Sequence, residues 1–473
     1  MKFICELCKN IVSDISDPIF RCPVCGSPKS AYKIYYEIED IDKKVFISNK
    51  NAGINRIDEK CINCGMCRKT CNKVTSLNFD KNNPECVSCG NCILTCPTGS
   101  LTPRYNYNEV KNILNEEKVV VAFIAPAVRT SISESFNLET GINLEGKVVN
   151  ALKLLGFDYV LDTTFGADIT IMEESKELLE RLNSKKNLPL FTSCCPAWVK
   201  FIEMKYPKFI PNLSSTKSPN SIMGSLIKSY FAESKNIKAE NIITVGIVPC
   251  TAKKCEGNRK ELVNNNLKNV DYYLTTTELI MLIKENNIDF LSLEDKNYDS
   301  LMGTGSSAGL IFGSTGGVME ANLRTLEYRL TGKNEKLDVK NIRTTESIKK
   351  ATIKIANKEI KVAVIYGLNN AKTVIEEIEN NGIHYDFIEV MACPCGCIGG
   401  AGNPLQNVNK FQEIRENRLK ELFNVDNSSV IKNPYQNKEV QKLYNKFLNK
   451  EKIHTLLHTT YSDKSQDIKS WLL

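Results

Sequence analysis

The cysteines of this 473-residue chain constrain its structure more than any other feature, because the 19 of them fall into four groups. The groups are Cys5, Cys8, Cys22 and Cys25; Cys61, Cys64, Cys67, Cys71, Cys86, Cys89, Cys92 and Cys96; Cys194, Cys195, Cys250 and Cys255; and Cys393, Cys395 and Cys397. In a large chain without a secretory signal, thiolates two or three residues apart are metal ligands far more often than disulfide partners. The sequence therefore predicts a protein with several metal centres.

Composition excludes several classes of protein. No apolar run is long enough to span a bilayer, and the start MKFICELCKN lacks the apolar core of a signal peptide. We therefore expect a cytoplasmic protein with no membrane association. The net charge of +7 is modest, and no basic stripe with interleaved aromatic residues is present, so we expect no nucleic-acid binding.

Four segments of the chain differ in composition and sequence pattern. Residues 1–36 hold the first four cysteines, residues 37–55 form a charged linker, and residues 56–103 hold eight cysteines in two similar halves. From residue 118 to residue 473, apolar β-rich runs alternate with amphipathic helical patterns. This alternation predicts a multidomain chain whose large domain is α/β, with buried and largely parallel strands.

The later cysteines follow predicted strands. Cys194 and Cys195 come after LPLFTS, Cys250 comes after IITVGIVP, and Cys393 comes after FIEVMA. Open α/β sheets bind ligands at the carboxyl ends of their strands. We therefore expect these three loops to converge on one buried metal cluster.

The middle group of cysteines has the spacing of a two-cluster ferredoxin. CINCGMCRKTC and CVSCGNCILTCP each read C-x2-C-x2-C-x3-C, in which three thiolates hold one [4Fe–4S] cluster and the fourth ligates the other. The predicted ligand sets are Cys61, Cys64, Cys67 and Cys96 for the first cluster, and Cys86, Cys89, Cys92 and Cys71 for the second. Zinc fits this spacing poorly. We expect a ferredoxin-like domain that transfers electrons.

The N-terminal group predicts a tetrahedral site of four sulfurs. The pairs Cys5–Cys8 and Cys22–Cys25 are both C-x2-C, which suits zinc or a single iron. The run CPVCGSPKSAY resembles the rubredoxin-like module at the end of rubrerythrins. That resemblance favours iron, and zinc remains the alternative.

Three further motifs resemble the signatures of the [FeFe] (iron-only) hydrogenases. They are TSCCPAW (192–198), PCTAKKCE (249–256) and EVMACPCGCIGGAGNP (389–404). The resemblance covers residues 118–473 together with the ferredoxin-like segment. It implies a large α/β domain that holds an H-cluster between two lobes, and the reaction 2H⁺ + 2e⁻ ⇌ H₂.

The resemblance also implies roles for individual residues. Four cysteines would hold the [4Fe–4S] part of the H-cluster, whose diiron unit carries CO, cyanide and an azadithiolate: Cys195, Cys250, Cys393 and Cys397. Cys194 would pass protons to the azadithiolate amine, because a thiol beside a cluster can have a tunable pKa. Lys253 would give a cyanide a charge-assisted hydrogen bond. The remaining pocket residues would be Ala125, Pro126 and Phe312.

A proton path is implied as well. Its residues would be Glu174, Ser214 and Glu177, with Arg181 near the mouth. Helical periodicity supports part of this path, since Glu174 falls on the apolar stripe between Ile171 and Leu178. The alternative is that Glu174 and Glu177 form surface ion pairs with nearby lysine and arginine residues.

The implied partners are H₂ and protons, ferredoxin or another small electron carrier, and the proteins that insert the diiron unit. Two other functions remain open. One is a hydrogenase-like protein that assists iron–sulfur assembly without H₂ turnover, against which the presence of Cys194 and Lys253 argues. The other is a sensory hydrogenase of low turnover, although no added signalling domain is evident.

Several positions depart from the family pattern and indicate a divergent branch. Cys395 stands where the family has glycine, and Val248 stands where it usually has methionine. Cys395 packs as a small side chain, or it captures or shields the open iron site under oxidising conditions. Cys255 is expected to pack.

Overall fold

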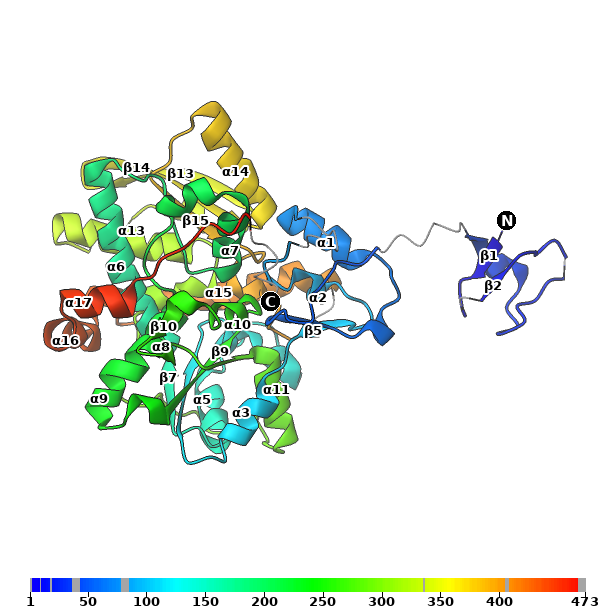
Figure 1. The fold of residues 1–473 in the computed structure, drawn as a ribbon, viewed down its shortest axis with the longest axis horizontal. Helices are drawn as coiled ribbons and strands as arrows, with labels where there is room; N and C mark the ends of the chain where they lie inside the picture. The colour runs from blue at the N-terminus through cyan, green and yellow to red at the C-terminus, as the bar shows by residue number, and fades with distance from the viewer. Residues whose placement is uncertain are drawn as a thin grey trace. The chain divides into compact units, whose positions relative to one another are not determined.

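The computed structural model describes the chain except for Met1, Lys9, Pro18 and residues 36–42, 78–84, 335–336, 405–407 and 467–473. Residues 37–42 of the predicted linker thus lie outside the described residues. The chain divides into two compact units, which are Met1–Lys44 with Asn63–Gly65, and Val45–Ile62 with Met66–Leu473 (Figure 1).

The smaller unit is a three-stranded antiparallel sheet with strand order β2-β1-β3. Its strands are β1 (Lys2–Cys5), β2 (Ile11–Val12) and β3 (Tyr32–Tyr35). Among its described residues, the buried cluster consists of Cys5, Ile15, Cys22 and Tyr32. A core of this size rarely stabilises a fold alone, which is why small domains so often contain a structural metal.

The ferredoxin-like segment repeats one pattern twice. The first cysteine run leads into α1 (Met66–Thr75), and the second leads into α2 (Asn91–Leu94). Strand β4 (Ile54–Arg56) pairs antiparallel with β5 (Leu101–Pro103) and closes the segment. Ile54, Cys67, Cys92 and Ile93 belong to its small core, so cysteines from both runs face inward.

The first large sheet is entirely parallel, with strand order β12-β9-β6-β7. The strands are β6 (Val119–Ile124), β7 (Tyr159–Asp162), β9 (Ile242–Val248) and β12 (Tyr272–Thr275). In Figure 1 this sheet lies in the lower part of the larger unit with three helices, α3 (Tyr107–Ile113), α5 (Glu145–Leu154) and α11 (Thr276–Glu285). Its strands are apolar because both faces are covered.

A second sheet of four strands, with order β13-β14-β15-β8, forms the other half of the larger unit. The strands are β8 (Leu190–Phe191), β13 (Ile348–Ile355), β14 (Lys358–Tyr366) and β15 (Phe387–Met391). Strands β14, β15 and β8 are parallel, and β13 joins β14 as an antiparallel hairpin. The predicted α/β class with largely parallel strands is confirmed, and the strands are shared between two sheets.

Helices connect and cover the two sheets. They include α6 (Thr163–Ser184), α7 (Pro196–Lys205), α8 (Pro219–Leu226), α13 (Gly317–Thr331) and α14 (Leu368–Asn381). Shorter elements are α4 (Val128–Ser131), α9 (Ala232–Lys235), α10 (Ala252–Glu256), α12 (Ser307–Leu310) and the hairpin of β10 (Val263–Asn264) and β11 (Leu267–Lys268). Helix α6 begins where the Asp162 side chain accepts a hydrogen bond from the Thr164 amide, so its start is capped directly after β7.

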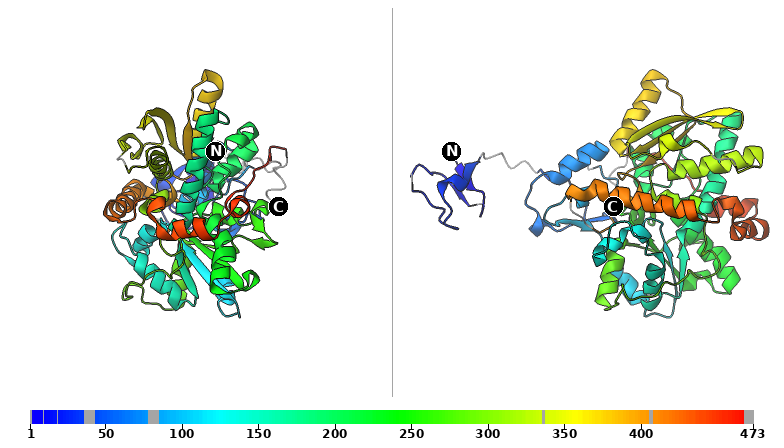
Figure 2. Two further views of the ribbon diagram at one scale, coloured as in Figure 1. Left: turned by 90° about the vertical axis from the view of Figure 1, so that its left-hand side faces the viewer. Right: turned by 180° about the vertical axis from the view of Figure 1, so that it is seen from behind.

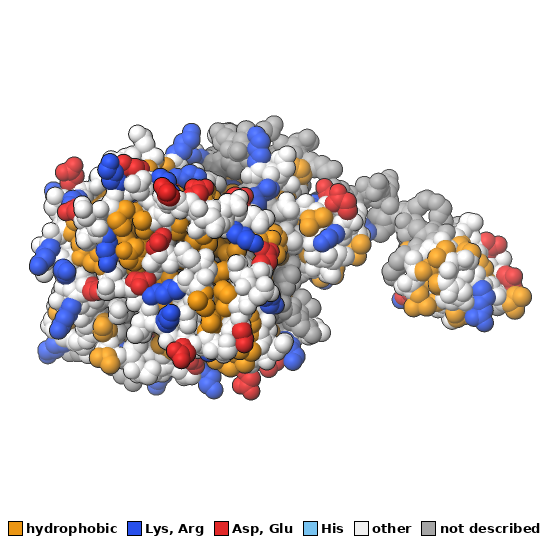
Figure 3. Space-filling model, turned by 90° about the horizontal axis from the view of Figure 1, so that it is seen from below, with side chains coloured by type: hydrophobic (Ala, Val, Ile, Leu, Met, Phe, Trp, Pro, Cys, Tyr) orange, Lys and Arg blue, Asp and Glu red, His pale blue; other side chains and the backbone are white. Residues whose placement is uncertain are grey.

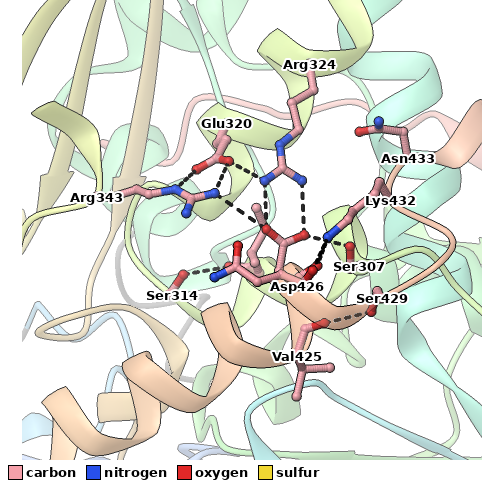
Figure 4. A network of polar contacts seen from close by, with 12 residues as sticks. Ser307, Ser314, Glu320, Arg324, Arg343, Val425, Asp426, Ser429, Lys432 and Asn433 are labelled. Atoms are coloured by element: carbon pink, nitrogen blue, oxygen red, sulfur yellow. Dashed lines mark hydrogen bonds and ion pairs between the residues drawn. The ribbon is translucent and has the colours of Figure 1, made fainter. Parts of the chain in front are cut away.

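The C-terminal part is helical and packs on both halves of the larger unit. It contains α15 (Phe411–Ser428), α16 (Lys438–Lys446) and α17 (Lys450–Lys452), followed by the π-helix η13 (Ile453–Leu457). Seen from behind, α15 crosses the middle of this unit (Figure 2). A buried ionic network ties α15 to α13, because Asp426 contacts Arg324 and Arg343, which both contact Glu320 (Figure 4).

The surface has no large region of one charge on the face that Figure 3 displays, where lysine and arginine side chains alternate with aspartate and glutamate. Among the described residues, no helix has both the length and the apolar character needed to cross a membrane.

Candidate functional site

Five of the predicted cysteines line one cavity in the larger unit: Cys194, Cys195, Cys250, Cys393 and Cys397. They come from the loops after β8, β9 and β15, so the site lies where the carboxyl ends of strands from both sheets meet. The expected convergence of the three loops is therefore observed. It occurs between two sheets, since β9 belongs to one and β8 and β15 belong to the other.

The loops approach each other so closely that side chains would not fit at certain positions. A Cβ on Gly400 would lie 2.3 Å from the carbonyl oxygen of Pro249, next to Cys250. Gly396 has φ +90°, and a Cβ there would lie 2.6 Å from the amide nitrogen of Thr315. Glycine is required at both positions, because any side chain would push the loop of Cys397 away from its neighbours.

The environment of the four cluster cysteines suits a group that carries positive charge. Burial raises the pKa of Cys195, Cys250 and Cys393, and it raises that of Cys397 to about 12. Four buried thiolates cannot share one apolar cavity without a cation, whereas bound iron deprotonates its thiols. Amides at the start of α7, from Ala197 and Trp198, also point at the Cys195 sulfur. The donor set therefore fits the cubane that the resemblance implies.

The other residues expected in the pocket line the same cavity, namely Ala125, Pro126, Lys253 and Phe312. The Lys253 ammonium group donates hydrogen bonds to the Cys194 carbonyl at 3.2 Å and to the Glu256 carboxylate at 2.7 Å. Burial alone would lower the pKa of Lys253, but the Glu256 carboxylate raises it above its usual value. Lys253 therefore keeps its charge inside the protein.

Glu256 was missed by the sequence analysis although it stands three residues after Lys253, a spacing that places both on one face of a helix. Its carboxylate also accepts hydrogen bonds from Ser218 at 3.1 Å and from Tyr273 at 3.4 Å. These contacts orient Glu256 toward Lys253. The signal that could have found it is this i,i+3 pair directly after Cys250.

The expected proton-path residues form a connected row. Glu174 is 1% exposed, and the Ser214 side chain is close enough to lower its pKa. The Ser214 hydroxyl donates to Glu177 at 3.0 Å, and Arg181 donates to the other oxygen of Glu177 at 2.5 Å. The alternative of two surface pairs is wrong for Glu174, whereas Glu177 does form the i,i+4 pair with Arg181.

Two groups at the inner end of this row have raised pKa values. Burial raises the pKa of Glu174 to about 8, helped by the charge of Glu177 and opposed by hydrogen bonds from Ser214 and Asn322. Burial also raises the pKa of the Cys194 thiol, with a further contribution from Glu174. Both groups hold a proton at neutral pH, which a proton donor at the inner end of a path requires.

Cys395 does not line the cavity. Its side chain packs against Leu419 and Leu422 and shares a hydrogen bond with Tyr366. This packing is what the simpler expectation for Cys395 describes, and the hypothesis that Cys395 captures or shields the iron site under oxidising conditions stays a prediction. Its backbone is left-handed, with φ +60°. Cys255, on α10, is half-buried and also outside the cavity.

The second set of ferredoxin-type cysteines is also assembled in the larger unit. Cys71, Cys86, Cys89 and Cys92 line one small cavity. Asn91 donates a hydrogen bond to the Cys89 sulfur at 3.3 Å. Cys195 is close enough to raise the pKa of Cys89, and Cys89 is close enough to raise that of Cys393, so this cavity neighbours the one lined by Cys195 and Cys393.

The first set of ferredoxin-type cysteines is divided between the two compact units. Cys61, Cys67 and Cys96 belong to the larger unit, where Cys67 and Cys96 contact one small core, and Cys64 is grouped with the smaller unit. Arg56 donates a hydrogen bond to the Cys61 sulfur at 3.5 Å, and the Val45 amide donates to Cys67 at 3.4 Å. Such donors stabilise thiolate ligands.

The N-terminal cysteines form a compact group. The sulfurs of Cys5, Cys8, Cys22 and Cys25 all lie within 4.8 Å of one another. The Cys8–Cys22 and Cys5–Cys25 separations are 3.4 and 3.7 Å. A tetrahedral site with metal–sulfur bonds of about 2.3 Å has sulfur–sulfur edges of about 3.8 Å. The geometry thus suits one tetrahedral metal ion, iron or zinc.

Comparison with known protein families agrees with this geometry. Residues 118–401 match the family model "Iron only hydrogenase large subunit, C-terminal domain", and residues 412–464 match "Iron hydrogenase small subunit". The chain is 38% identical over 445 residues to iron hydrogenase 1 of Clostridium pasteurianum. The aligned region covers 89% of this chain and 78% of that protein. It is also 30% identical over 368 residues to the cytosolic Fe-S cluster assembly factor narfl of Xenopus tropicalis, covering 75% of this chain and 76% of that protein.

A solved structure gives the same result. The apo [FeFe]-hydrogenase of Chlamydomonas reinhardtii, in a variant form, superimposes with a TM-score of 0.67 at 36% identity. The match covers 75% of this chain and 98% of that one.

Proposed function

Because this chain belongs to the iron-only hydrogenase family, we propose that it catalyses 2H⁺ + 2e⁻ ⇌ H₂ at an H-cluster held by Cys195, Cys250, Cys393 and Cys397. The observation that carries the proposal is the row of proton-bearing groups that leads from Arg181 to Cys194, which lines the same cavity as the four cysteines. A protein that only held a cubane would have no need for such a row.

When bound, the H-cluster would supply the iron chemistry that makes and splits H₂. The protein residues would hold and move the proton. Protonated Glu174 donates toward the cavity and is recharged through Ser214 from Glu177, and the reverse sequence removes a proton during H₂ oxidation. Lys253 offers a charged donor to an anionic ligand, and Glu256 holds it in place.

Electrons would reach the cavity through the two ferredoxin-type [4Fe–4S] clusters. The cavity of Cys71, Cys86, Cys89 and Cys92 neighbours that of the catalytic cysteines, which supports this order. Ferredoxin or another small carrier would deliver the electrons, and dedicated maturation proteins would insert the diiron unit. The proposed location is the cytoplasm under anaerobic conditions.

The N-terminal site would extend the route if its metal is iron. A rubredoxin-type iron has a potential well above that of ferredoxin-type cubanes, so electrons would run from H₂ to this site and the enzyme would favour H₂ uptake. Metal analysis of the purified chain tests this step. Zinc at Cys5, Cys8, Cys22 and Cys25 would remove its basis.

The main experiment uses the full chain matured without oxygen. We expect infrared bands of CO and cyanide ligands, H₂ evolution with reduced viologen, and H₂ oxidation with the oxidised dye. The Cys194→Ala variant should keep the bands and lose activity by about 10²- to 10⁴-fold, the contribution typical of a positioned proton donor.

The second candidate is iron–sulfur assembly without H₂ turnover, which the similarity to the narfl assembly factor supports. Absence of both the infrared bands and H₂ turnover in the matured chain would favour this function. Bands accompanied by very slow turnover would favour a sensory hydrogenase instead.

A further inference from the structure

His458 lies at the outer end of the proton path, although it is 243 residues away from the path in sequence. Its Nδ1 atom is 3.0 Å from the Ser215 hydroxyl, and its Nε2 atom is 3.4 Å from the Glu173 carboxylate. The backbone fixes this position, because Thr459 donates to the Ser215 carbonyl at 2.8 Å and residues 216 and 458 form a β-bridge. The ring is therefore held between two polar partners.

Ser215 connects this histidine to the path. Its amide donates to the Glu177 carboxylate at 3.1 Å, and its hydroxyl is 3.4 Å from the same oxygen. That oxygen also accepts the hydrogen bond from Ser214. An unbroken row of polar contacts thus runs from Ser214 through Glu177 and Ser215 to His458.

Arg181, expected at the mouth of the path, cannot itself release a proton. A guanidinium group stays protonated in proteins, so Arg181 can orient Glu177 but cannot pass its proton to water. Imidazole exchanges protons near neutral pH. The His458 side chain is 18% exposed, which lets its ring exchange protons with solvent.

We propose that His458 is a positioning and proton-relay residue, which the part of the chain resembling the small subunit (412–464) supplies to the path between Glu177 and water. This inference rests on the proposed hydrogenase function. In the inward step, the protonated ring gives its Nδ1 proton to the Ser215 oxygen while the Ser215 hydroxyl proton passes to Glu177. The ring then regains a proton from water, and the outward step is the reverse.

The groups around His458 favour this role. Glu173 and Tyr444 bond to each other, and the Glu173 carboxylate faces the ring. Burial raises the pKa of Glu173, but its hydrogen bonds with His458 and Tyr444 lower it below its usual value overall, so an ionised carboxylate faces the ring. The titratable groups on the packed elements are Glu173, Lys176 and Glu177 on α6, Lys217 beside Ser215, Tyr444 on α16, and Lys452 and His454 in the preceding helices. Lys217 bonds the Thr455 carbonyl and not the ring.

The test uses matured full-length protein with His458→Gln and His458→Ala. Glutamine keeps hydrogen-bonding atoms but does not exchange protons near neutral pH. His454→Gln is the matched control, because His454 is exposed in the preceding helix. We expect both His458 variants to evolve H₂ about tenfold more slowly or worse, with unchanged infrared bands and unchanged KM for the electron donor. Imidazole added to His458→Ala should restore much of the rate, and His454→Gln should match wild type.

Ser215→Ala provides a second variant. It removes the hydroxyl that links the ring to Glu177, and its effect should not add to that of His458→Gln, because both interrupt one row. A structural readout is available through ¹⁵N-labelled histidine, of which the chain has only three. The Nδ1 resonance of His458 should move in Ser215→Ala, and the Nε2 resonance should move in Glu173→Gln.

Failure of the relay and failure of the function give different results. If wild type turns over H₂ while His458→Gln stays within twofold of it at every pH and imidazole has no effect, protons leave Glu177 directly to water and the relay is wrong. Unmoved nitrogen resonances would also reject the relay. If wild type shows neither bands nor turnover, the hydrogenase function fails, and the relay fails with it.

Discussion

The Thr251 hydroxyl donates a 2.7 Å hydrogen bond to the backbone carbonyl of Ser88. Thr251 follows Cys250, and Ser88 precedes Cys89, so this bond joins the segments that carry the proposed ligands of two clusters. Gly90 completes the contact, because a Cβ there would lie 2.5 Å from the Ala401 Cβ and 2.6 Å from the Thr251 hydroxyl. Electron tunnelling slows steeply with distance, so this close packing bears on the rate of electron delivery.

Gly90→Ala should therefore slow ferredoxin-driven H₂ evolution and lower stability. The matched control is Gly99→Ala, since Gly99 also has a positive φ but no atom within 4 Å of the added Cβ. Both variants incur the left-handed strain of about 1–2 kcal/mol, and Gly90→Ala adds about 1–3 kcal/mol of overpacking. Anaerobic thermal unfolding and turnover measure the two effects. Identical behaviour of both variants would reject a role for close packing at Gly90.

The raised pKa of Glu174 makes stability depend on pH. Folded Glu174 has a pKa of about 8 and the unfolded carboxyl about 4.5, so the folded state binds the extra proton between these values. The free energy of unfolding of wild type should therefore fall as pH rises from about 4.5 to 8, by a few kcal/mol from this group. Glu174→Gln lacks this contribution.

Thermal unfolding of Glu174→Gln and wild type at several pH values checks this expectation. The variant should gain stability relative to wild type as pH rises toward 8, and the difference should be constant above it. Glu180→Gln, at an exposed position of the same helix, is the control. Glu174→Gln should also lose about 10²-fold or more in H₂ turnover, because glutamine cannot pass a proton. A difference in stability that stays flat from pH 5 to 8 would contradict the raised pKa.

Local patterns predicted the site better than they predicted its surroundings. The positions of Cys195, Cys250 and Cys393 after apolar strands indicated the convergence of three loops, and the apolar stripe indicated the burial of Glu174. The division of those strands between two sheets leaves no local trace, because either arrangement buries the same apolar runs. His458 could not be found from the sequence either, since a single histidine in a polar tail has no periodic signal and its position depends on how the tail packs.

The residue type of Cys395 allows two roles, and the direction of its side chain favours packing over contact with the iron site. Its sulfur packs outside the cavity, so Cys395→Gly and wild type should lose activity to oxygen at the same rate. Cys395→Ala should be about 1 kcal/mol less stable than Cys395→Gly, because alanine keeps the left-handed strain at φ +60° while glycine relieves it. Oxygen-exposure assays and thermal unfolding test both statements. Oxygen inactivation of Cys395→Gly that is slower or faster than that of wild type would show that the Cys395 sulfur does act at the iron site.

The ionic network of Figure 4 joins the part of the chain that resembles the large subunit to the part that resembles the small subunit. Asp426 accepts hydrogen bonds from Ser307 at 2.6 Å and from Arg324 at 2.8 Å. Burial raises the pKa of Asp426, but the Arg324 guanidinium lowers it below its usual value overall, so the carboxylate is charged inside the protein. Removing it would leave two arginines with Glu320 as their shared buried partner.

Asp426→Ala should therefore cost about 3–5 kcal/mol, the usual penalty for breaking a buried ion pair from one side. Asp426→Asn should cost less, because the amide oxygen can still accept from Ser307 and Arg324. The exposed pair Lys372–Glu376 offers a matched contrast, and Glu376→Ala should change stability by less than about 1 kcal/mol. Since the same C-terminal part carries His458, Asp426→Ala should also reduce H₂ turnover near its unfolding temperature. Equal thermal stability of Asp426→Ala and Glu376→Ala would mean that this network does not hold the two parts together.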